Sequence, residues 1–359
     1  MFEISQFIDR DCLSAKPKKK VDKKGLINLS SNELLSIKLN SLQRKFIPCS
    51  SANQYPYYPR VRNKISELLH LDPDRVEFYA GSDSAIYYLL DSLGNNLDAL
   101  LLTYPNYENY FSYAKLNKIP IVLWRIDSES LNFCAAKGIE LIDNYKDSRI
   151  ALVVTNPNGF TGQLLETDVI KTLAEHLHHS NGLLILDLAY ISFSKDELSF
   201  YTNDLCKEYD NIILVNTLSK SHGLAAARFG YLYGDPKLMS YIRQWNGINA
   251  ISGFTYDLVE YYLRNENFIR DLRRCVISNR RIFESSIQDS SRLNVTESQG
   301  NFIFLTDRQP DEVDRLDLRF LKEGYIIRRF ESKLKLNSSY RITVPADFSP
   351  KICNILSAY

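Results

Sequence analysis

The sequence predicts an α/β protein: a mostly parallel, seven-stranded sheet covered by helices on both faces, followed by a smaller α+β domain. The sheet is predicted from seven apolar runs near residues 76–80, 99–103, 120–125, 150–155, 183–187, 211–216 and 229–234. Continuous apolar runs of this length are typical of strands buried on both faces. Helical and strand patterns mix from about residue 255 onward. We therefore expect an N-terminal arm over 1–25, a large domain over 26–254, and a small C-terminal domain over 255–359 that the arm joins.

Composition narrows the class of protein. The formal net charge of the 359 residues is +1, so no overall field favours nucleic acid or an anionic membrane. No apolar run is long enough to span a bilayer, and the first residues lack the pattern of a signal peptide. The six cysteines are widely spaced and form no CxxC pair, which disfavours a metal site or a disulfide framework. A cytoplasmic protein is expected, with a solvated basic segment over 16–24.

The first predicted strand runs into a turn suited to an anion. Gly81 allows a tight strand-to-helix turn, Ser82 and Asp83 offer capping oxygens, and Ile86 and Leu89 continue with helical spacing. The unpaired N–H groups of the first helical turn attract negative charge. An ordinary capped helix would have the same sequence, so the turn alone does not establish a binding site.

Two later strands end in residues suited to catalysis. The strand over 183–187 ends at Asp187, with Tyr190 three residues further on, and the strand over 211–216 leads into Lys220. Ligands of open α/β sheets bind outside the carboxyl ends of strands. A desolvated lysine can form a Schiff base, and Arg228 could bind a phosphate. Lys220 alone would be read as a surface lysine; Asp187 on a nearby strand end favours a catalytic interpretation.

These two stretches carry a family resemblance. Thr217-Leu218-Ser219-Lys220 with Arg228, and Asp187-Leu188-Ala189-Tyr190, resemble fold-type I aminotransferases of class I/II, especially the histidinol-phosphate aminotransferase branch. The resemblance extends from about Ile27 to about Val344. It implies pyridoxal 5'-phosphate as cofactor and amino-group transfer between an amino acid or amino-phosphate donor and a 2-oxo acid. Lys220 would form the Schiff base, Asp187 would pair with the ring nitrogen, and Tyr190 would reach the ring.

The resemblance also implies roles for residues elsewhere in the chain. Tyr107 would stack on the cofactor ring, and Arg341 would bind the substrate's anionic group with Arg328 as a second contact. Asn32, in a segment that passes over the cofactor, would contact the substrate. Tyr55 would reach the cofactor phosphate of a partner subunit, which implies a homodimer. The remaining cofactor contacts implied by the resemblance are Ser82, Asp83, Asn158, Thr217, Ser219 and Arg228.

One motif departs from the family pattern. The family has Asn-Pro-x-Asn-Pro-Thr-Gly, in which the second Asn binds the ring oxygen, whereas this chain has Gly159-Phe160 at the second Asn-Pro. Either Asn158 moves into that role, or the ring oxygen depends on Tyr190 alone. Loss of a donor to that oxygen could raise the Schiff-base pKa, or it could mark a changed reaction.

Other readings stay open from the sequence alone. A decarboxylase similar to threonine-phosphate decarboxylase, or another specialised biosynthetic enzyme, would use the same scaffold. A cofactor-binding protein without turnover is a further alternative. His176, His178 and His179 could suggest a metal site, but cations are favoured at a helix C-terminus in any case, and we expect no metal.

Overall fold

The protein was analysed as a computed structural model, which describes residues 25–50, 52–127, 130–247, 250–288, 290–311, 313–330 and 339–359. Residues 1–24 of the predicted arm, including the basic segment over 16–24, lie outside the described residues.

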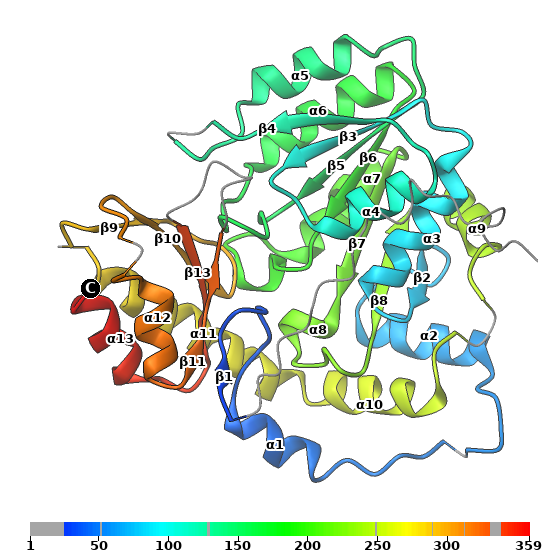
Figure 1. Cartoon of the computed structure of the whole chain (residues 1–359). Helices are drawn as coiled ribbons and strands as arrows, with labels where there is room; N and C mark the ends of the chain where they lie inside the picture. The colour runs from blue at the N-terminus through cyan, green and yellow to red at the C-terminus, as the bar shows by residue number, and fades with distance from the viewer. Residues whose placement is uncertain are drawn as a thin grey trace, which may run out of the picture.

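A seven-stranded sheet forms the centre of the larger part of the molecule (Figure 1). Its order is β2-β8-β7-β6-β5-β3-β4, and only β8 runs antiparallel to its neighbours. The mostly parallel sheet predicted from the apolar runs is therefore confirmed. Its strands are β2 Val76–Tyr79, β3 Ala99–Tyr104, β4 Ile121–Arg125, β5 Ile150–Thr155, β6 Leu183–Asp187, β7 Ile212–Thr217 and β8 Gly230–Gly234.

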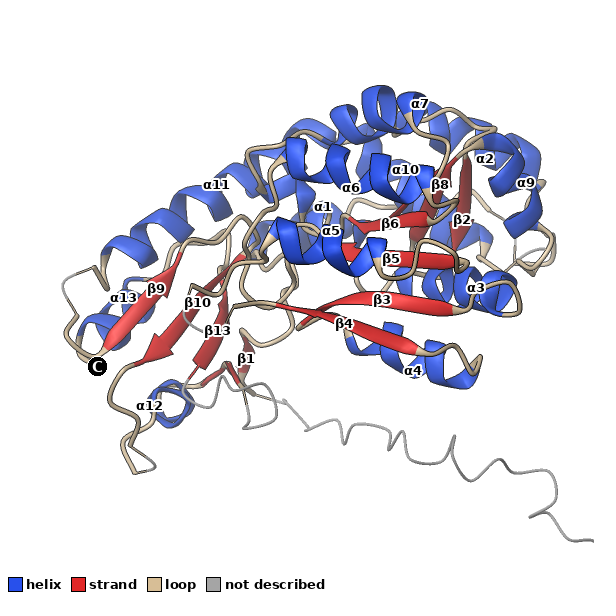
Figure 2. Cartoon of the chain, turned by 90° about the horizontal axis from the view of Figure 1, so that it is seen from above, coloured by secondary structure: helices blue, strands red, loops and turns tan. Residues whose placement is uncertain are grey.

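Helices cover both faces of this sheet (Figure 2). Alternate residues of each central strand join two separate apolar clusters: Leu152 lies in one, and its neighbour Val153 lies in the other. Helices α3, α4 and α9 contribute to the second cluster, and α2, α5 and α6 to the first. Burial on both faces is why these strands are apolar throughout. The helices are α2 Tyr58–Leu68, α3 Ser82–Gly94, α4 Glu108–Leu116, α5 Ala135–Asp143, α6 Thr167–His179, α7 Cys206–Glu208, α8 Leu218–Ser221 and α9 Pro236–Arg243.

Helix α6 begins four residues later than the sequence predicts. The sequence pattern indicates a helix from residue 163, but the structure starts it at Thr167. The side chain of Asn156 accepts a hydrogen bond from the N–H of Leu165 at 2.8 Å and donates to its carbonyl at 3.3 Å. These bonds engage the N–H and carbonyl of Leu165 outside a helical pattern, and the helix begins two residues later.

The C-terminal part of the chain forms a second, antiparallel sheet with the order β12-β13-β10-β9. The long helix α11 packs against β10 and also against the short 3-10 helix Ile191–Phe193 of the larger part. The strands are β9 Leu293–Thr296, β10 Phe302–Asp307, β12 Arg328–Arg329 and β13 Ser339–Thr343, and the helices are α10 Gly253–Arg264, α11 Glu266–Ser285, α12 Leu316–Lys322 and α13 Pro350–Ser357.

The segment after residue 25 belongs spatially with this second sheet. Strand β1 (Ile27–Asn28) pairs in parallel with β11 (Tyr325–Ile326), and α1 (Ile37–Gln43) follows. The sequence analysis assigns this segment to the large domain, which it begins at residue 26. The limits of the arm and of the two domains stay predictions. The segment between β1 and α1 passes the carboxyl ends of β5, β6 and β7.

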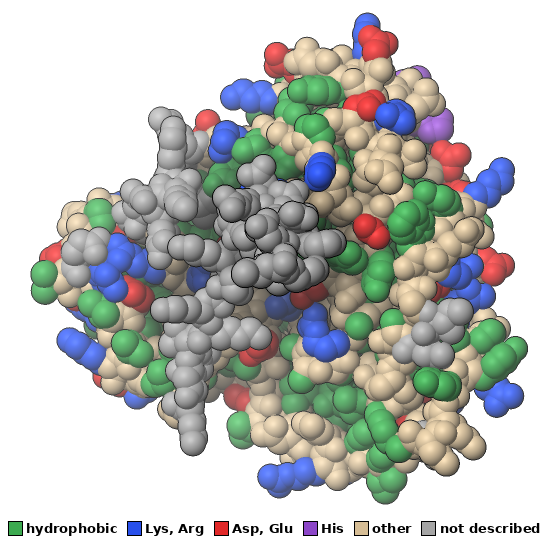
Figure 3. Space-filling model, turned by 45° about the vertical axis from the view of Figure 1, so that its right-hand side comes forward, with side chains coloured by type: hydrophobic (Ala, Val, Ile, Leu, Met, Phe, Trp, Pro, Cys, Tyr) green, Lys and Arg blue, Asp and Glu red, His purple; other side chains and the backbone are tan. Residues whose placement is uncertain are grey.

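The described surface agrees with the near-zero net charge. Acidic and basic side chains are interspersed over the face shown in Figure 3, without a continuous region of one sign. Within the described residues, no helix is both long enough and apolar enough to cross a membrane.

Candidate active site

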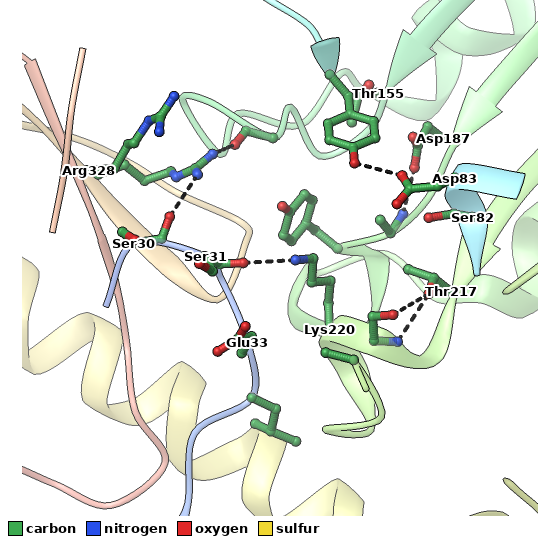
Figure 4. Close-up of a pocket in the computed structure, with 18 of the residues that line it drawn as sticks. Ser30, Ser31, Glu33, Ser82, Asp83, Thr155, Asp187, Thr217, Lys220 and Arg328 are labelled. Atoms are coloured by element: carbon green, nitrogen blue, oxygen red, sulfur yellow. Dashed lines mark hydrogen bonds between the residues drawn. The ribbon is translucent and has the colours of Figure 1, made fainter. Parts of the chain in front are cut away.

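A cavity of about 820 Å³ lies between the two sheets (Figure 4). The last residues of three neighbouring parallel strands line it, namely Thr155 of β5, Asp187 of β6 and Thr217 of β7. This is the edge of an α/β sheet where ligands are expected to bind. The sequence-predicted residues that line the cavity are Ser82, Asp83, Tyr107, Asp187, Tyr190, Thr217, Ser219, Lys220, Arg228, Arg328 and Arg341.

Lys220 enters the cavity from the short helix α8, directly after β7. Thr217 caps this helix, because its hydroxyl accepts a hydrogen bond from the N–H of Ser219 at 3.1 Å. The Lys220 amine donates to the carbonyl of Ser31 at 2.8 Å, across the cavity opening. The amine is half-buried and faces no carboxylate hydrogen-bond partner among the described residues. A lysine in this setting is suited to act as a nucleophile and a base.

Asp187 lies at the floor of the cavity. One carboxylate oxygen accepts from the Tyr110 hydroxyl at 3.1 Å, and the other accepts from the N–H of Ala189 at 3.1 Å. Burial raises the pKa of Asp187 to about 6, although these two hydrogen bonds oppose the shift. A cationic partner in the cavity would therefore stabilise the charged form of this carboxylate. Sequence reasoning missed Tyr110, whose only sequence signal is helical spacing from Tyr107.

The start of α3 and Arg228 form an anion-binding corner. Gly81 is the N-cap residue with φ of +84°, so Ser82 and Asp83 do not provide the predicted side-chain cap. The N–H groups of the first turn therefore stay available to a ligand. Asp83 turns instead toward Arg228, whose Nη2 donates to it at 3.0 Å, and toward the Tyr107 hydroxyl at 2.6 Å.

A side chain at Gly81 would close this corner. A Cβ built there would lie 2.5 Å from Nη2 of Arg228. The left-handed conformation of Gly81 already favours glycine. The close approach of the turn to the guanidinium thus depends on this residue.

Arg341 projects from β13 at the other end of the cavity. Its side chain is partly buried, and its guanidinium donates to the carbonyls of Gly159 and Ser30. It has no carboxylate partner among the described residues, and its Nε has no hydrogen bond. Burial, with nearby Arg328, lowers the pKa of Arg341. A partly buried guanidinium without a carboxylate partner among the described residues is a strong candidate to bind an anion.

Three phenylalanine rings surround this guanidinium, which sequence reasoning did not foresee. The ring centres of Phe160, Phe302 and Phe330 lie 5.9, 5.3 and 5.9 Å from Cζ of Arg341. Contacts of this kind stabilise a cation and hold its plane. The Phe160 that replaces a family proline therefore packs at the substrate end of the cavity.

The structure does not bring Asn158 into the cavity. Its side-chain amide donates to the carbonyl of Pro105 at 3.0 Å, and its oxygen accepts from the N–H groups of Phe160 and Thr161. These bonds hold the loop turn and leave Asn158 99% buried. Gly159 is the residue that faces the cavity, beside the Tyr190 ring. Of the two sequence alternatives, the geometry favours dependence on Tyr190.

Two further predicted residues lie outside the cavity lining. Asn32 is buried behind Tyr190 and donates to the Tyr190 hydroxyl at 3.1 Å, so it contacts a predicted cofactor residue rather than the open cavity. Tyr55 is 85% exposed on the surface of this chain. An exposed tyrosine is available to a second subunit, as its predicted role requires. His176 and His178 lie on α6 and face Asp143 and Asp210.

The residues present fit the expected cofactor, pyridoxal phosphate. An amine, a buried carboxylate and an anion-binding corner all face one cavity, where they match the cofactor's aldehyde, ring nitrogen and phosphate. Tyr190 adds a hydroxyl beside Gly159. A Cβ at position 159 would lie only 3.3 Å from the Tyr190 ring, so the glycine leaves room for this ring.

Comparisons with known proteins agree with this arrangement. A family model described as aminotransferase class I and II matches residues 24–357. The chain is 26% identical over 300 residues to the histidinol-phosphate aminotransferase of Brachyspira hyodysenteriae, covering 81% of this chain and 79% of that protein.

Two solved structures share the fold. The histidinol-phosphate aminotransferase of Sinorhizobium meliloti in complex with pyridoxal-5'-phosphate superposes with a TM-score of 0.77 at 15% identity, covering 97% of this chain and 95% of that one. The L-threonine-O-3-phosphate decarboxylase of Porphyromonas gingivalis gives 0.73 at 16% identity, covering 93% and 98%.

Proposed function

This chain belongs to the aminotransferase class I and II family, and from that membership we propose that Lys220 and Asp187 carry out pyridoxal-phosphate-dependent transamination in the cavity between the sheets. The observation that carries the proposal is the placement of both side chains in one cavity from the ends of adjacent strands, together with the guanidinium of Arg341. An amino donor and a 2-oxo acid are its substrates.

Lys220 acts as the anchor and the proton carrier. When bound, pyridoxal phosphate supplies an aldehyde that links to amines and a ring that accepts the electron pair left by the departing α-proton. The Lys220 Nζ would hold the cofactor by this aldehyde. As a free amine, Nζ would serve as the base that takes the substrate's α-proton and as the acid that returns it. The segment whose Ser31 carbonyl accepts from Nζ helps to keep this amine inside the cavity.

Asp187 holds the ring nitrogen in its protonated form. The raised pKa of the carboxyl shows that its charge is poorly solvated without a partner. A ring N–H⁺ would supply that partner, and the pair would lower the pKa of Asp187 again. Tyr110 and the N–H of Ala189 keep the carboxylate directed at this position.

The start of α3 would hold the cofactor phosphate. The N–H groups of Ser82 and Asp83 and the side chains of Thr217, Ser219 and Arg228 would hold it, with Tyr107 against the ring. Tyr55 of a second subunit would complete the site, so the active form would be a homodimer. The exposed position of Tyr55 supports this assignment.

Arg341 and Arg328 select the anionic end of the substrate. Arg341 is held among three aromatic rings and is partly shielded from water, so it favours a planar carboxylate or a phosphate. Two N–H groups of Arg341 donate to the carbonyls of Gly159 and Ser30. Substrate binding would replace these hydrogen bonds with bonds to the substrate's anionic group. The names of the similar proteins, a histidinol-phosphate aminotransferase among them, support an amino-phosphate or amino-acid donor.

A single-turnover absorbance scan tests the proposal. Protein loaded with pyridoxal phosphate is mixed separately with glutamate, an aromatic amino acid, histidinol phosphate and threonine phosphate, while carbon dioxide is monitored. Transamination converts the yellow cofactor band to the band of pyridoxamine phosphate and identifies the donor. Carbon dioxide release with the yellow band restored would assign decarboxylation instead. Absence of a yellow band would contradict the role of Lys220.

A further inference from the structure

The Tyr190 hydroxyl receives a hydrogen bond from the other side of the cavity. Nδ2 of Asn32 donates to it at 3.1 Å, and both side chains are buried. The Tyr190 ring also packs edge-on against Phe302, with ring centres 5.4 Å apart at 85°. Tyr190 follows β6 of the large sheet, whereas Asn32 follows β1, which pairs with the C-terminal part. The bond therefore joins the two parts of the molecule at the cavity.

Asn32 is held in one orientation by its surroundings. Its N–H donates to the Thr343 hydroxyl at 2.9 Å, and that hydroxyl donates in turn to Oδ1 of Asn32 at 3.2 Å. The Asn301 amide donates to the Asn32 carbonyl at 3.0 Å. With Oδ1 already accepting from Thr343, the amide nitrogen is the end that faces Tyr190.

This orientation decides where the Tyr190 proton points. A hydroxyl oxygen that accepts from an amide keeps its own proton free to donate elsewhere. The opposite side of Tyr190 is the cavity, where Gly159 supplies no side-chain donor. Asn32 also has φ of +54°, a conformation that asparagine tolerates better than most residues and that the three contacts hold in place.

We propose that Asn32 is a positioning residue that donates to the Tyr190 hydroxyl and so directs the Tyr190 proton onto the ring oxygen of bound pyridoxal phosphate. This inference rests on the proposed function. It gives Asn32 a role through Tyr190 in place of the substrate contact expected from the sequence. It also explains how the site can work with glycine at position 159. The ring oxygen would lack the donor that the family's second Asn provides, but the Tyr190 hydroxyl would be fixed in position to donate to it.

The pH dependence of the cofactor absorbance tests this proposal directly. Deprotonation of the nitrogen that links Lys220 to the cofactor increases the negative charge on the ring oxygen. A donor to that oxygen therefore favours the deprotonated form and lowers the midpoint of the absorbance change. We expect Asn32→Ala to raise the midpoint of the loaded protein by up to about one pH unit, in the same direction as Tyr190→Phe.

The double variant Asn32→Ala/Tyr190→Phe distinguishes positioning of the Tyr190 hydroxyl from a general loosening of the packing around the cavity. If Asn32 acts through Tyr190, Asn32→Ala in a Tyr190→Phe background adds no further shift. Additive shifts, or a wild-type midpoint in Asn32→Ala, would overturn the inference, while a yellow band together with conversion to pyridoxamine phosphate would still uphold the proposed function. No yellow band in the wild-type protein would overturn both.

Asn279→Ala is the matched control. Asn279 is another buried asparagine of the C-terminal part, and its amide donates to the carbonyls of Pro345 and Ala346, away from the cavity. Its removal loosens packing without touching Tyr190, so the absorbance midpoint stays at the wild-type value. A shift in this variant equal to that of Asn32→Ala would count against positioning.

Discussion

At the scale of single residues, the site combines groups that are poorly stable by themselves. Asp187 is a buried carboxylate, and Arg341 is a partly buried guanidinium without a carboxylate partner among the described residues. Each charge would be stabilised further by a ligand group of opposite sign. Buried charges of this kind cost folding free energy, so they are expected where function requires them.

Lys220→Ala should abolish transamination. Without Nζ the protein has neither the covalent anchor nor the proton carrier, so turnover should fall by several orders of magnitude while pyridoxal phosphate still binds non-covalently. Turnover assays with the donor found above, and an absorbance spectrum free of the lysine-linked yellow band, check both parts. Wild-type rates in this variant would refute the assignment of Lys220.

Asp187→Asn should change the pH dependence of stability in the cofactor-free protein. The pKa of Asp187 is about 6 in the folded state and 3.8 ordinarily, so between these values the folded state holds a proton that the unfolded chain has lost. The free energy of unfolding therefore falls as the pH rises through this window, by about 3 kcal/mol from this group.

The asparagine variant lacks this titration. The difference in free energy of unfolding between the two proteins, measured by urea denaturation at pH 4 and pH 7, should change by about 2 kcal/mol in favour of the variant at pH 7. The same variant should bind pyridoxal phosphate more weakly. Parallel stability curves for the two proteins would show that Asp187 is not desolvated as the structure indicates.

At the scale of elements, the start of α3 and the loop after α8 meet at the corner proposed to bind the phosphate. Gly81 lets the turn approach Arg228, and Asp83 holds the guanidinium in place. Arg228 itself has φ of +54°, so its backbone is bent to bring the side chain back toward α3. The anion-binding corner is thus a property of two elements far apart in the sequence.

Arg228→Ala should raise the dissociation constant of pyridoxal phosphate about 10- to 100-fold, because a charge-assisted hydrogen bond to the phosphate is lost. Arg228→Lys keeps the charge but lacks the planar fork, so we expect an intermediate value. Equilibrium dialysis measures both, best in a Lys220→Ala background that removes the covalent link. Equal affinities in all three proteins would place the phosphate elsewhere.

At the scale of the whole molecule, the cavity exists because two sheets and the segment after β1 close around it. Arg341 of β13 reaches the carbonyl of Gly159 beyond β5, and Lys220 after β7 reaches the carbonyl of Ser31. These contacts tie the two parts of the chain together at the site itself. Movement of either part would alter substrate and cofactor contacts together.

Mixing two inactive variants tests whether the active form is a dimer with shared sites. Tyr55→Glu places a carboxylate where the partner's cofactor phosphate would bind, and it should not disturb folding because Tyr55 is exposed. In heterodimers with Lys220→Ala, one of the two sites has both wild-type residues. Refolding the two variants together should therefore restore roughly a quarter of wild-type activity.

Activity no greater than that of the separate variants would indicate that Tyr55 serves no partner site. As a control, each variant is refolded alone and assayed at the same total concentration. Sedimentation velocity on the mixture verifies that heterodimers can form.

The sequence by itself determined the sheet and placed Asp187 and Lys220 at the ends of its strands, where a catalytic role is proposed for them. Long apolar runs have few other solutions than strands buried on both faces, and parallel strands bring their carboxyl ends to one edge. Local signals of this kind can be read without the fold. Residues matching a known motif, such as Arg228 and Arg341, were also identified in advance.

Only the tertiary structure decided which side chains meet across long sequence separations. It turned Asn158 into its own loop, directed Tyr110 to Asp187, gathered three phenylalanines around Arg341, and set Asn32 behind Tyr190. Each of these contacts depends on packing between elements far apart in the chain. Such packing leaves no periodic or spacing signal in a single sequence, because the direction of a side chain is fixed by its neighbours in space.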